Sequence, residues 1–257
     1  MTSWSALDDE LERWRDDGGT PSLWWRDDDA TRDGEALDRL IALNRQWNIP
    51  LALAVIPGLA EPSLAETLSA RPDIAILQHG FRHTNHATSA DKKSELGPHR
   101  PVVEIIGQLN EGRRLMQFLF GDGSLPVLVP PWNRVDPRVV AELPDVGFHG
   151  ISGFQARAGR EIAPGLVQVN THVDIIDWQQ HRGFRGVEAV LGDLCGHLAA
   201  RRTGAVDASE PTGLLTHHMA HDDACWAFIE ALLERTSLGV DLWQSAAGIF
   251  ALRADLH

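Results

Sequence analysis

Short apolar runs alternate with longer segments of helical periodicity along most of this 257-residue chain. The runs that predict strands cover residues 22–28, 51–56, 74–80, 126–132, 147–153, 166–176 and 213–219. Near-continuous apolar strands separated by helices are typical of a parallel sheet that helices cover. No glycine-rich phosphate-binding turn follows the first strand, which disfavours a dinucleotide-binding fold. We therefore expect an α/β fold, a distorted (β/α)7-type barrel of parallel strands with outer helices.

The intervening segments predict helices at residues 1–17, 33–47, 62–70, 101–120, 136–143, 186–201 and 222–235. Leu37, Leu40 and Ile41, for example, fall on one side of the second of these helices. The sequence contains no internal repeat and no low-complexity tract, and its length suits one large domain. We expect a single domain over residues 1–257, with residues 1–20 as an N-terminal helical extension.

Charge and composition limit the partners. Acidic residues outnumber Lys and Arg 36 to 23, a net charge of −13, which argues against nucleic acid or an anionic membrane as the main partner. The acidic N-terminus lacks the features of a signal peptide, and no apolar run approaches transmembrane length. Cys195 and Cys225 provide neither a disulfide framework nor a thiolate metal site. We expect a cytoplasmic protein whose partner is a small molecule or a glycan; its oligomeric state is not indicated.

Polar side chains gather directly after five of the predicted strands. The stretches are residues 27–29, 79–86, 130–134, 174–178 and 217–218. Catalytic groups of α/β barrels lie at the carboxyl ends of the strands, so these stretches should meet at one rim.

Two of these stretches together predict a metal site. The three successive carboxylates of "WWRDDDA" repel one another and need a compensating positive charge, although a solvated turn that caps a helix is the ordinary alternative. His79 and His83 are four residues apart in "LQHGFRHTNH". Two imidazoles with a carboxylate and an open position form a catalytic zinc site. We predict a divalent metal, Zn²⁺ first, with Co²⁺, Ni²⁺, Mn²⁺ and Fe²⁺ as alternatives.

The five stretches resemble, in order, the five motifs of the polysaccharide deacetylases (carbohydrate esterase family 4, the NodB-homology barrel). "RDDDA" resembles the paired-Asp motif, "HGFRH" the His-x-x-x-His motif, "PPWN" the Pro-aromatic-Gly loop, "DIIDW" the Asp-x-x-Asp-Trp motif and "LTH" the Leu-x-His motif. The resemblance implies a metal-dependent hydrolase that removes an N-acetyl or similar acyl group from a sugar or a related small amide.

The resemblance also implies roles for individual residues. Asp28 matches the general base and Asp29 the metal-binding carboxylate, because the small residue Ala30 follows them. The alternative register, with Asp27 as base and Asp28 as ligand, stays open at this point. His79 and His83 match the two metal-binding histidines.

The last two motifs supply the acid. His217 matches the general acid, and Asp174 matches the residue that orients it. His218 competes with His217, but adjacent strand residues point to opposite faces, so only one can enter the barrel mouth. His172 falls on the same strand face as Asp174. A separate metal cluster within "HHMAHDD" is a further alternative.

The third motif departs from the family pattern. Its usual Arg is Val129 here, so that Arg134 or Arg26 would have to replace it, and its usual Gly is Asn133. We expect a backbone N–H near Trp132 and Asn133 to stabilise the oxyanion. The remaining candidate substrate contacts are Arg134, His86 and Trp178, the last walling the pocket together with Trp132.

These departures suggest a divergent subgroup and keep two other functions open. One is a barrel amidohydrolase or esterase that acts on a substrate other than a sugar. The other is a catalytically inactive barrel that binds glycan or metal without turnover.

Overall fold

The computed structural model describes residues 3–237 and 242–251. The strands are β1 (Leu23–Ala30), β2 (Leu51–Val55), β3 (Ile74–His79), β4 (Ser124–Val129), β5 (Gly150–Ile151), β6 (Glu161–Ala163), β7 (Leu166–Gln168), β8 (Val173–Asp174) and β9 (Thr212–Thr216). The α-helices are α1 (Trp4–Asp16), α2 (Glu35–Trp47), α3 (Pro62–Ser69), α4 (Val102–Phe120), α5 (Pro137–Glu142), α6 (Val187–Arg202), α7 (Asp223–Ser237) and α8 (Ala246–Ile249).

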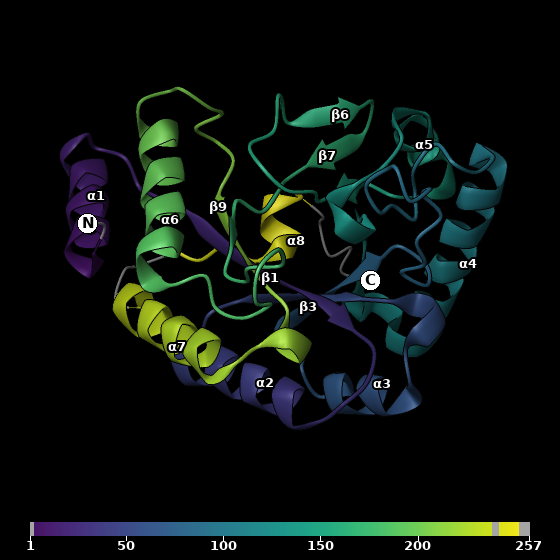
Figure 1. Cartoon of the computed structure of the whole chain (residues 1–257), viewed down its shortest axis with the longest axis horizontal. Coiled ribbons are helices and arrows are strands. Elements are labelled where there is room, and N and C mark those ends of the chain that lie inside the picture. The colour runs from purple at the N-terminus through teal and green to yellow at the C-terminus, as the bar shows by residue number, and fades with distance from the viewer. Residues whose placement is uncertain (1–2, 238–241, 252–257) are drawn as a thin grey trace.

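The strands form one sheet in the order β6-β7-β5-β4-β3-β2-β1-β9-β8, in which only the pair β6 and β7 is antiparallel. Helices surround the strands: α6 and α7 lie on one side, α2 and α3 below, and α4 and α5 on the other side (Figure 1). This arrangement confirms the predicted α/β fold. Strand β1 pairs with β2 on one side and with β9 on the other.

One extended segment, residues 166–174, links the two ends of the sheet. Its first part pairs with β5, and its last part pairs with β9. Backbone hydrogen bonds from Thr171 N to Gly153 O (3.1 Å) and from His172 N to Gly213 O (2.8 Å) mark the change of partner. The strand predicted at 166–176 is therefore divided into β7 and β8, because the chain changes partner between them, and the strand predicted at 147–153 is shortened to β5.

The core follows the apolar periodicity of the sequence. All of β2 is buried, and Leu37 and Leu40 of α2 are 1% and 0% exposed in the same core. Helix α1 belongs to this core too: Leu7 is buried, Trp14 Nε1 donates to Leu198 O of α6 (3.2 Å), and the Trp4 ring stacks on Phe228 of α7. The predicted N-terminal helix is thus packed against the barrel.

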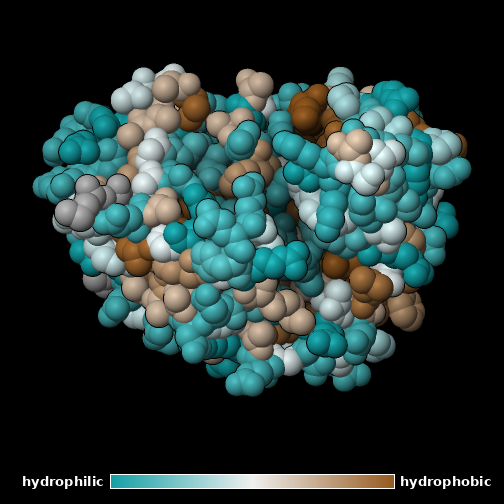
Figure 2. All heavy atoms as spheres, viewed as in Figure 1, coloured by the Kyte–Doolittle hydropathy of each residue, from teal (hydrophilic) through white to brown (hydrophobic). Residues whose placement is uncertain are grey.

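The visible face in Figure 2 is largely hydrophilic, with small separate hydrophobic areas. Exposed large apolar side chains such as Phe118, Val103 and Leu59 lie on different parts of the chain. Within the described residues no helix has both the length and the apolar character that crossing a bilayer requires. Residues 240, 241 and 252, which belong to the stretch "VDLWQSAAGIFAL" after the last predicted helix, lie outside the described residues.

Candidate metal and catalytic site

A cavity of about 870 Å³ opens at the carboxyl ends of the strands. Its lining residues are Asp28, Asp29, His79, His83, Lys93, Trp132, Asn133, Arg134, Phe154, Gln155, Asp174, Trp178, Gln179, Arg182 and His217. The five polar stretches of the sequence therefore meet at one rim, where α/β barrels carry their catalytic groups.

Asp29, His79 and His83 form the floor of this cavity. Asp29 Oδ1 lies 3.1 Å from His79 Nε2 and 3.4 Å from His83 Nε2. The candidate ligand atoms of the three residues all lie within 4.8 Å of one another. Asp29 and His83 both adopt left-handed backbone conformations (φ 71° and 55°), which turn their side chains toward the end of β3.

The donor set suits a divalent cation. His79 Nδ1 lies 3.0 Å from Val129 O, and donation of its proton to that carbonyl leaves the Nε2 lone pair facing Asp29. Asp29 Oδ1 is buried, yet it makes no well-directed hydrogen bond with the described residues. A buried, unsatisfied carboxylate oxygen beside two imidazole nitrogens is the arrangement of a His₂-carboxylate metal site.

Electrostatics agree with this geometry. Burial raises the pKa of the Asp29 carboxyl, but the close contact with His79 and the charges of His79, His217 and His83 together outweigh it, and the net pKa lies below the ordinary value. Burial lowers the pKa of the His83 imidazole, and the neighbouring His79 lowers it further. An ionised carboxylate and a neutral imidazole are the protonation states that bind metals. At His79 burial lowers the pKa, but the carboxylates of Asp28 and Asp29 outweigh it and the net pKa is raised, so a bound cation would have to displace a proton there.

Glu95, from the loop after β3, fixes the turn between the two histidines. Its buried carboxylate accepts from Phe81 N (3.0 Å), Arg82 N (2.8 Å) and Thr84 N (3.3 Å). Gly80 (φ 54°) lies against this carboxylate, and a Cβ there would overlap it. The role of Glu95 could not be predicted from the sequence, because the hydrophobic pattern does not show which loop residue contacts a distant turn.

Arg26 holds Asp28 in place. Its Nε and Nη2 donate to Asp28 Oδ1 (2.9 Å) and Oδ2 (3.0 Å), and both side chains are buried. Nη1 donates to Ser152 O (3.0 Å), while Nη2 also donates to Asn133 Oδ1 (2.9 Å). Of the two arginines that could replace the one missing at Val129, it is therefore Arg26 that pairs with Asp28. The side chain of Asn133 tethers this arginine.

Asp27 points to the other side of β1. Its carboxylate pairs with His218 Nδ1 (2.5 Å) and accepts from Thr216 Oγ1 (2.6 Å) and His218 N (3.0 Å). Both Asp27 and His218 are fully buried and absent from the cavity lining. Burial raises the pKa of Asp27, but His218 outweighs it, so the net pKa is lowered. The geometry favours the register in which Asp28 and Asp29 face the cavity.

His217, Asp174 and Trp178 form the wall opposite the floor. Trp178 Nε1 donates to Asp174 Oδ2 (2.8 Å), and its ring meets the His217 ring edge-on with centroids 4.7 Å apart. Ile176 N donates to Asp174 Oδ1 (2.9 Å). No hydrogen bond joins Asp174 to His217 within the described part of the chain; Trp178 contacts both of them. Burial raises the pKa of Asp174, although His217 partly offsets this.

The β4 loop presents Trp132 to the cavity. Its ring lies 4.2 Å from the His83 ring. Trp132 and Asn133 are both left-handed (φ 54° and 55°), and Asn133 N donates to Pro130 O (2.8 Å). Since the Asn133 N–H is occupied, the Trp132 N–H is the better oxyanion donor in this loop.

Backbone strain concentrates at the cavity. Of the eight non-glycine residues with positive φ in the described part of the chain, six line it: Asp29, His83, Trp132, Asn133, Gln155 and Arg182. Such conformations persist where the surrounding structure enforces them, and they cluster at functional sites.

The structure does not bring every predicted residue to the cavity, and it adds others. His86 is absent from the lining, and its N–H donates to Ser94 O (3.0 Å) within the loop. The prediction that His86 contacts substrate therefore finds no support here. Lys93, Phe154, Gln155, Gln179 and Arg182 line the cavity but were missed, since they lie on irregular loops without a motif.

A second histidine group does not suit a metal. His172, His197 and Glu210 lie close together near the amino end of β9. Gly213 N donates to His172 Nδ1 (2.9 Å), so Nε2 carries the proton and faces Glu210 Oε2 (3.3 Å). The rings of His172 and His197 stack with centroids 3.5 Å apart, so their lone pairs do not converge on one point. His172 therefore belongs to this buried network rather than to the site of Asp174.

The "HHMAHDD" stretch is likewise divided among separate contacts. His217 lines the cavity, His218 pairs with Asp27, and Asp222 accepts from Cys225 N (2.8 Å) at the start of α7. The described side chains do not gather there into a separate metal cluster.

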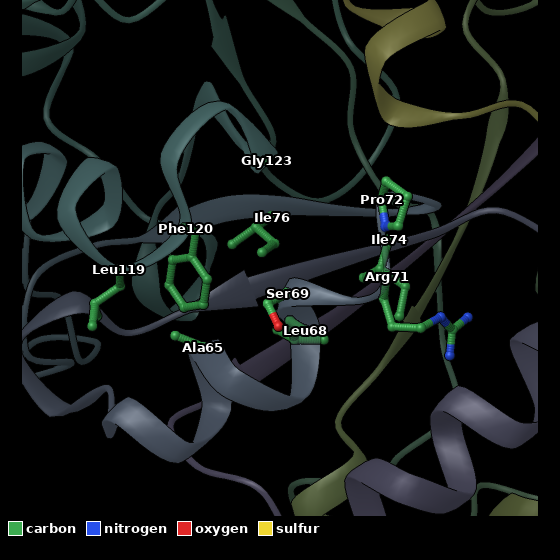
Figure 3. Close-up of a pocket in the computed structure, with 10 residues that line it drawn as sticks. All are labelled: Ala65, Leu68, Ser69, Arg71, Pro72, Ile74, Ile76, Leu119, Phe120 and Gly123. Carbon is green, nitrogen blue, oxygen red and sulfur yellow. The ribbon is translucent and has the colours of Figure 1, made fainter.

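A smaller pocket of about 270 Å³ lies at the opposite end of the strands, between α3 and the end of α4. Figure 3 shows its apolar side chains, among them Leu119, Phe120 and Ile76, and the Arg71 guanidinium extending away from them. Arg71 also forms an ion pair with Asp73 (2.6 Å). No convergent set of catalytic groups is found among the residues that line it.

Comparisons with known proteins show which solved structures share this fold. No protein-family model matches the sequence, and no curated protein matches it. Among solved structures, a protein from Mycobacterium smegmatis described as a polysaccharide deacetylase is 15% identical, with a TM-score of 0.60 over 84% of this chain and 76% of that chain. A family 4 acetyl xylan esterase from Clostridium thermocellum, in complex with a cobalt ion, is 12% identical, with a TM-score of 0.52 over 90% of each chain.

A mutant of BA3943, a family 4 pseudoenzyme with restored enzymatic activity, is 16% identical, with a TM-score of 0.53 over 84% of this chain and 64% of that chain. At these identities the likeness shows the fold alone, an α/β fold shared with these family 4 deacetylase and esterase structures.

Proposed function

We propose that this protein is a metal-dependent hydrolase that removes an N-acetyl or similar acyl group from a sugar or a related small amide. One observation carries the proposal: a carboxylate held by a buried arginine, a His₂-carboxylate group and a free histidine line one cavity. These groups supply the base, the cation site and the acid that amide hydrolysis needs. Solved deacetylases and esterases with this fold support the same chemistry.

Asp29, His79 and His83 would hold the cation, which would supply Lewis acidity toward water and the acyl oxygen. Asp28 takes a proton from the attacking water, and Arg26 keeps this carboxylate oriented. The Trp132 N–H donates to the developing oxyanion. His217 protonates the departing amine, and Trp178, which is hydrogen-bonded to Asp174, packs against its ring. Trp132 and Trp178 offer faces on which a sugar ring can stack.

Metal content is the first test. Protein reconstituted with Zn²⁺ and then dialysed should retain about one metal per chain, and His79→Ala and His83→Ala should each lose most of it. Equal metal content in all three proteins would contradict the assignment of these ligands.

Acetate release from a panel of N-acetylated sugars tests the reaction. We expect release by the metal-replete protein and a loss of about 10²-fold or more in Asp28→Asn. Turnover of aryl esters or cyclic amides alone would indicate the non-sugar amidohydrolase or esterase. Full metal binding with no turnover of any substrate would indicate an inactive barrel. The cytoplasmic location stays a prediction that cell fractionation can check.

A further inference from the structure

We propose that the substrate carries an anionic group, a carboxylate or a phosphate, and that Lys93, Arg134 and Arg182 bind it. This inference rests on the proposed function, since it concerns the same cavity. It narrows the substrate class from N-acylated sugars in general to N-acylated sugars with a negative charge.

Three cations line the mouth of the cavity without an acidic partner. Lys93 comes from the loop after β3, Arg134 from the loop after β4, and Arg182 from the loop after β8. Within residues 3–237 and 242–251 none of them forms an ion pair, whereas Arg26, deeper in the cavity, is paired with Asp28. They are therefore available to a ligand.

The carboxylates of the cavity are engaged elsewhere. Asp28 pairs with Arg26, Asp29 faces the two metal-site histidines, and Asp174 accepts from Trp178 Nε1. With a divalent cation bound at Asp29, the positive groups of the lining exceed the negative ones. The chain as a whole carries a net charge of −13, so the positive charge at the mouth of the cavity is opposite to that of the whole protein.

Contacts between two loops fix the position of the Arg134 guanidinium. Its Nη1 donates to Lys93 O (2.8 Å), which fixes the guanidinium beside the Lys93 backbone. A bridge between Leu96 and Val135 and a hydrogen bond from Asp136 N to Leu96 O (2.8 Å) tie the two loops together. Nε and Nη2 have no hydrogen-bond partner among the described residues, and a planar guanidinium matches a carboxylate or phosphate.

A neutral glycan would not need this arrangement. Aromatic faces such as those of Trp132 and Trp178 suffice to bind an uncharged sugar ring. Lys93 and Arg134 hold like charges on loops that are tied together, which costs free energy that a bound anion would offset.

Binding to the metal-loaded Asp28→Asn variant tests the inference without turnover. Calorimetry should compare N-acetylglucosamine, N-acetylglucosamine 6-phosphate and N-acetylmuramic acid. At low ionic strength at least one anionic sugar should bind with a Kd about tenfold lower than the neutral one, and high salt should reduce the difference. The phosphate and carboxylate arms identify which anion is preferred.

Charge-removing variants locate the site. Arg134→Gln and Arg182→Gln, each in the Asp28→Asn background, should raise the Kd of the preferred anionic sugar by about threefold to tenfold. Lys92→Gln is the matched control, because it removes the same charge one residue from Lys93 at a position outside the cavity lining. Equal affinity for neutral and anionic sugars, an equal effect of Lys92→Gln, or no binding at millimolar concentrations would overturn the inference.

The two hypotheses fail in different ways. Acetate release by the unsubstituted protein from neutral and anionic sugars at equal kcat/KM would overturn the anion site and leave the hydrolase. Selective binding of an anionic sugar without any acetate release would overturn the hydrolase and leave the anion site.

Discussion

The position of Asp28, the proposed general base, depends on the single side chain of Arg26. The buried Arg26 guanidinium donates hydrogen bonds through its five N–H groups. Its acceptors are oxygen atoms of Asp28, Ser152, Gly153 and Asn133. Lys cannot reproduce this fork, because an ammonium is a point charge with three donors.

Arg26→Lys should therefore lower kcat by about 10-fold to 10²-fold while the metal content stays near that of the unsubstituted protein. The pH–rate profile should be recorded alongside kcat, because Arg26 contacts Asp28 directly. An unchanged profile and an unchanged kcat would show that Arg26 has no influence on the base.

Asp27→Asn separates the two possible registers of the aspartates. The substitution removes the charge from a fully buried pair with His218, so unfolding free energy should fall by about 3 kcal/mol. The midpoint of urea unfolding measures this. Activity of the folded fraction should survive; a stable but inactive Asp27→Asn protein would instead assign the base to Asp27.

Among the structural elements, the loop after β3 holds the turn that carries His79 and His83 in place. Glu95 accepts hydrogen bonds from the amides of Phe81, Arg82 and Thr84 on either side of His83, so the geometry of the candidate metal site depends on a loop residue more than ten positions away.

Glu95→Gln replaces one acceptor oxygen by an NH₂ group that faces N–H donors. We expect metal affinity to weaken by about 10-fold to 10²-fold, as measured by competition with a chelator. Glu104→Gln, at the exposed start of α4, is the matched control. A Glu95→Gln protein with full metal affinity but lower thermal stability would reduce Glu95 to a structural role.

At the scale of the whole molecule, two neutral histidines set the response to acid. Burial lowers the pKa of His197 to about 3 and that of His221 to about 4. Below the ordinary pKa of about 6.5, these groups bind protons in the unfolded chain but not in the fold. Stability therefore falls as pH falls from about 6.5 toward 4, by up to about 1.4 kcal/mol per pH unit for each group.

Urea unfolding at pH 7, 6, 5 and 4.5 tests this slope, and His197→Gln should make it shallower. Asp174, whose pKa burial raises, acts in the opposite sense above pH 3.8, and the two histidines outweigh it. A stability that rises on acidification over this range would contradict the prediction.

Sequence patterns predict the regular strands and helices of this molecule. Apolar runs and helical periodicity give the barrel, because each strand and helix buries its own apolar face. The pairing of Arg26 with Asp28 is also readable, since residues two apart on a strand share a face. Glu95, Gln155 and Arg182 are different: they reach the site through irregular loops and left-handed backbone, which depend on contacts distant in sequence. For the same reason, the division of residues 166–174 between β5 and β9 could not be predicted.

Because Arg26 and Asp28 stand on one strand, their spacing is fixed by two peptide units. A cross-strand pair would stretch whenever neighbouring strands slide, whereas this pair moves as one body. Val129 is left to fill the core with its side chain and to bind His79 and Gly80 through its carbonyl oxygen. In the loop after β4, Asn133 contacts Arg26. Substitutions at the other positions of this loop can therefore change ligand specificity while the Arg26–Asp28 pair stays in place.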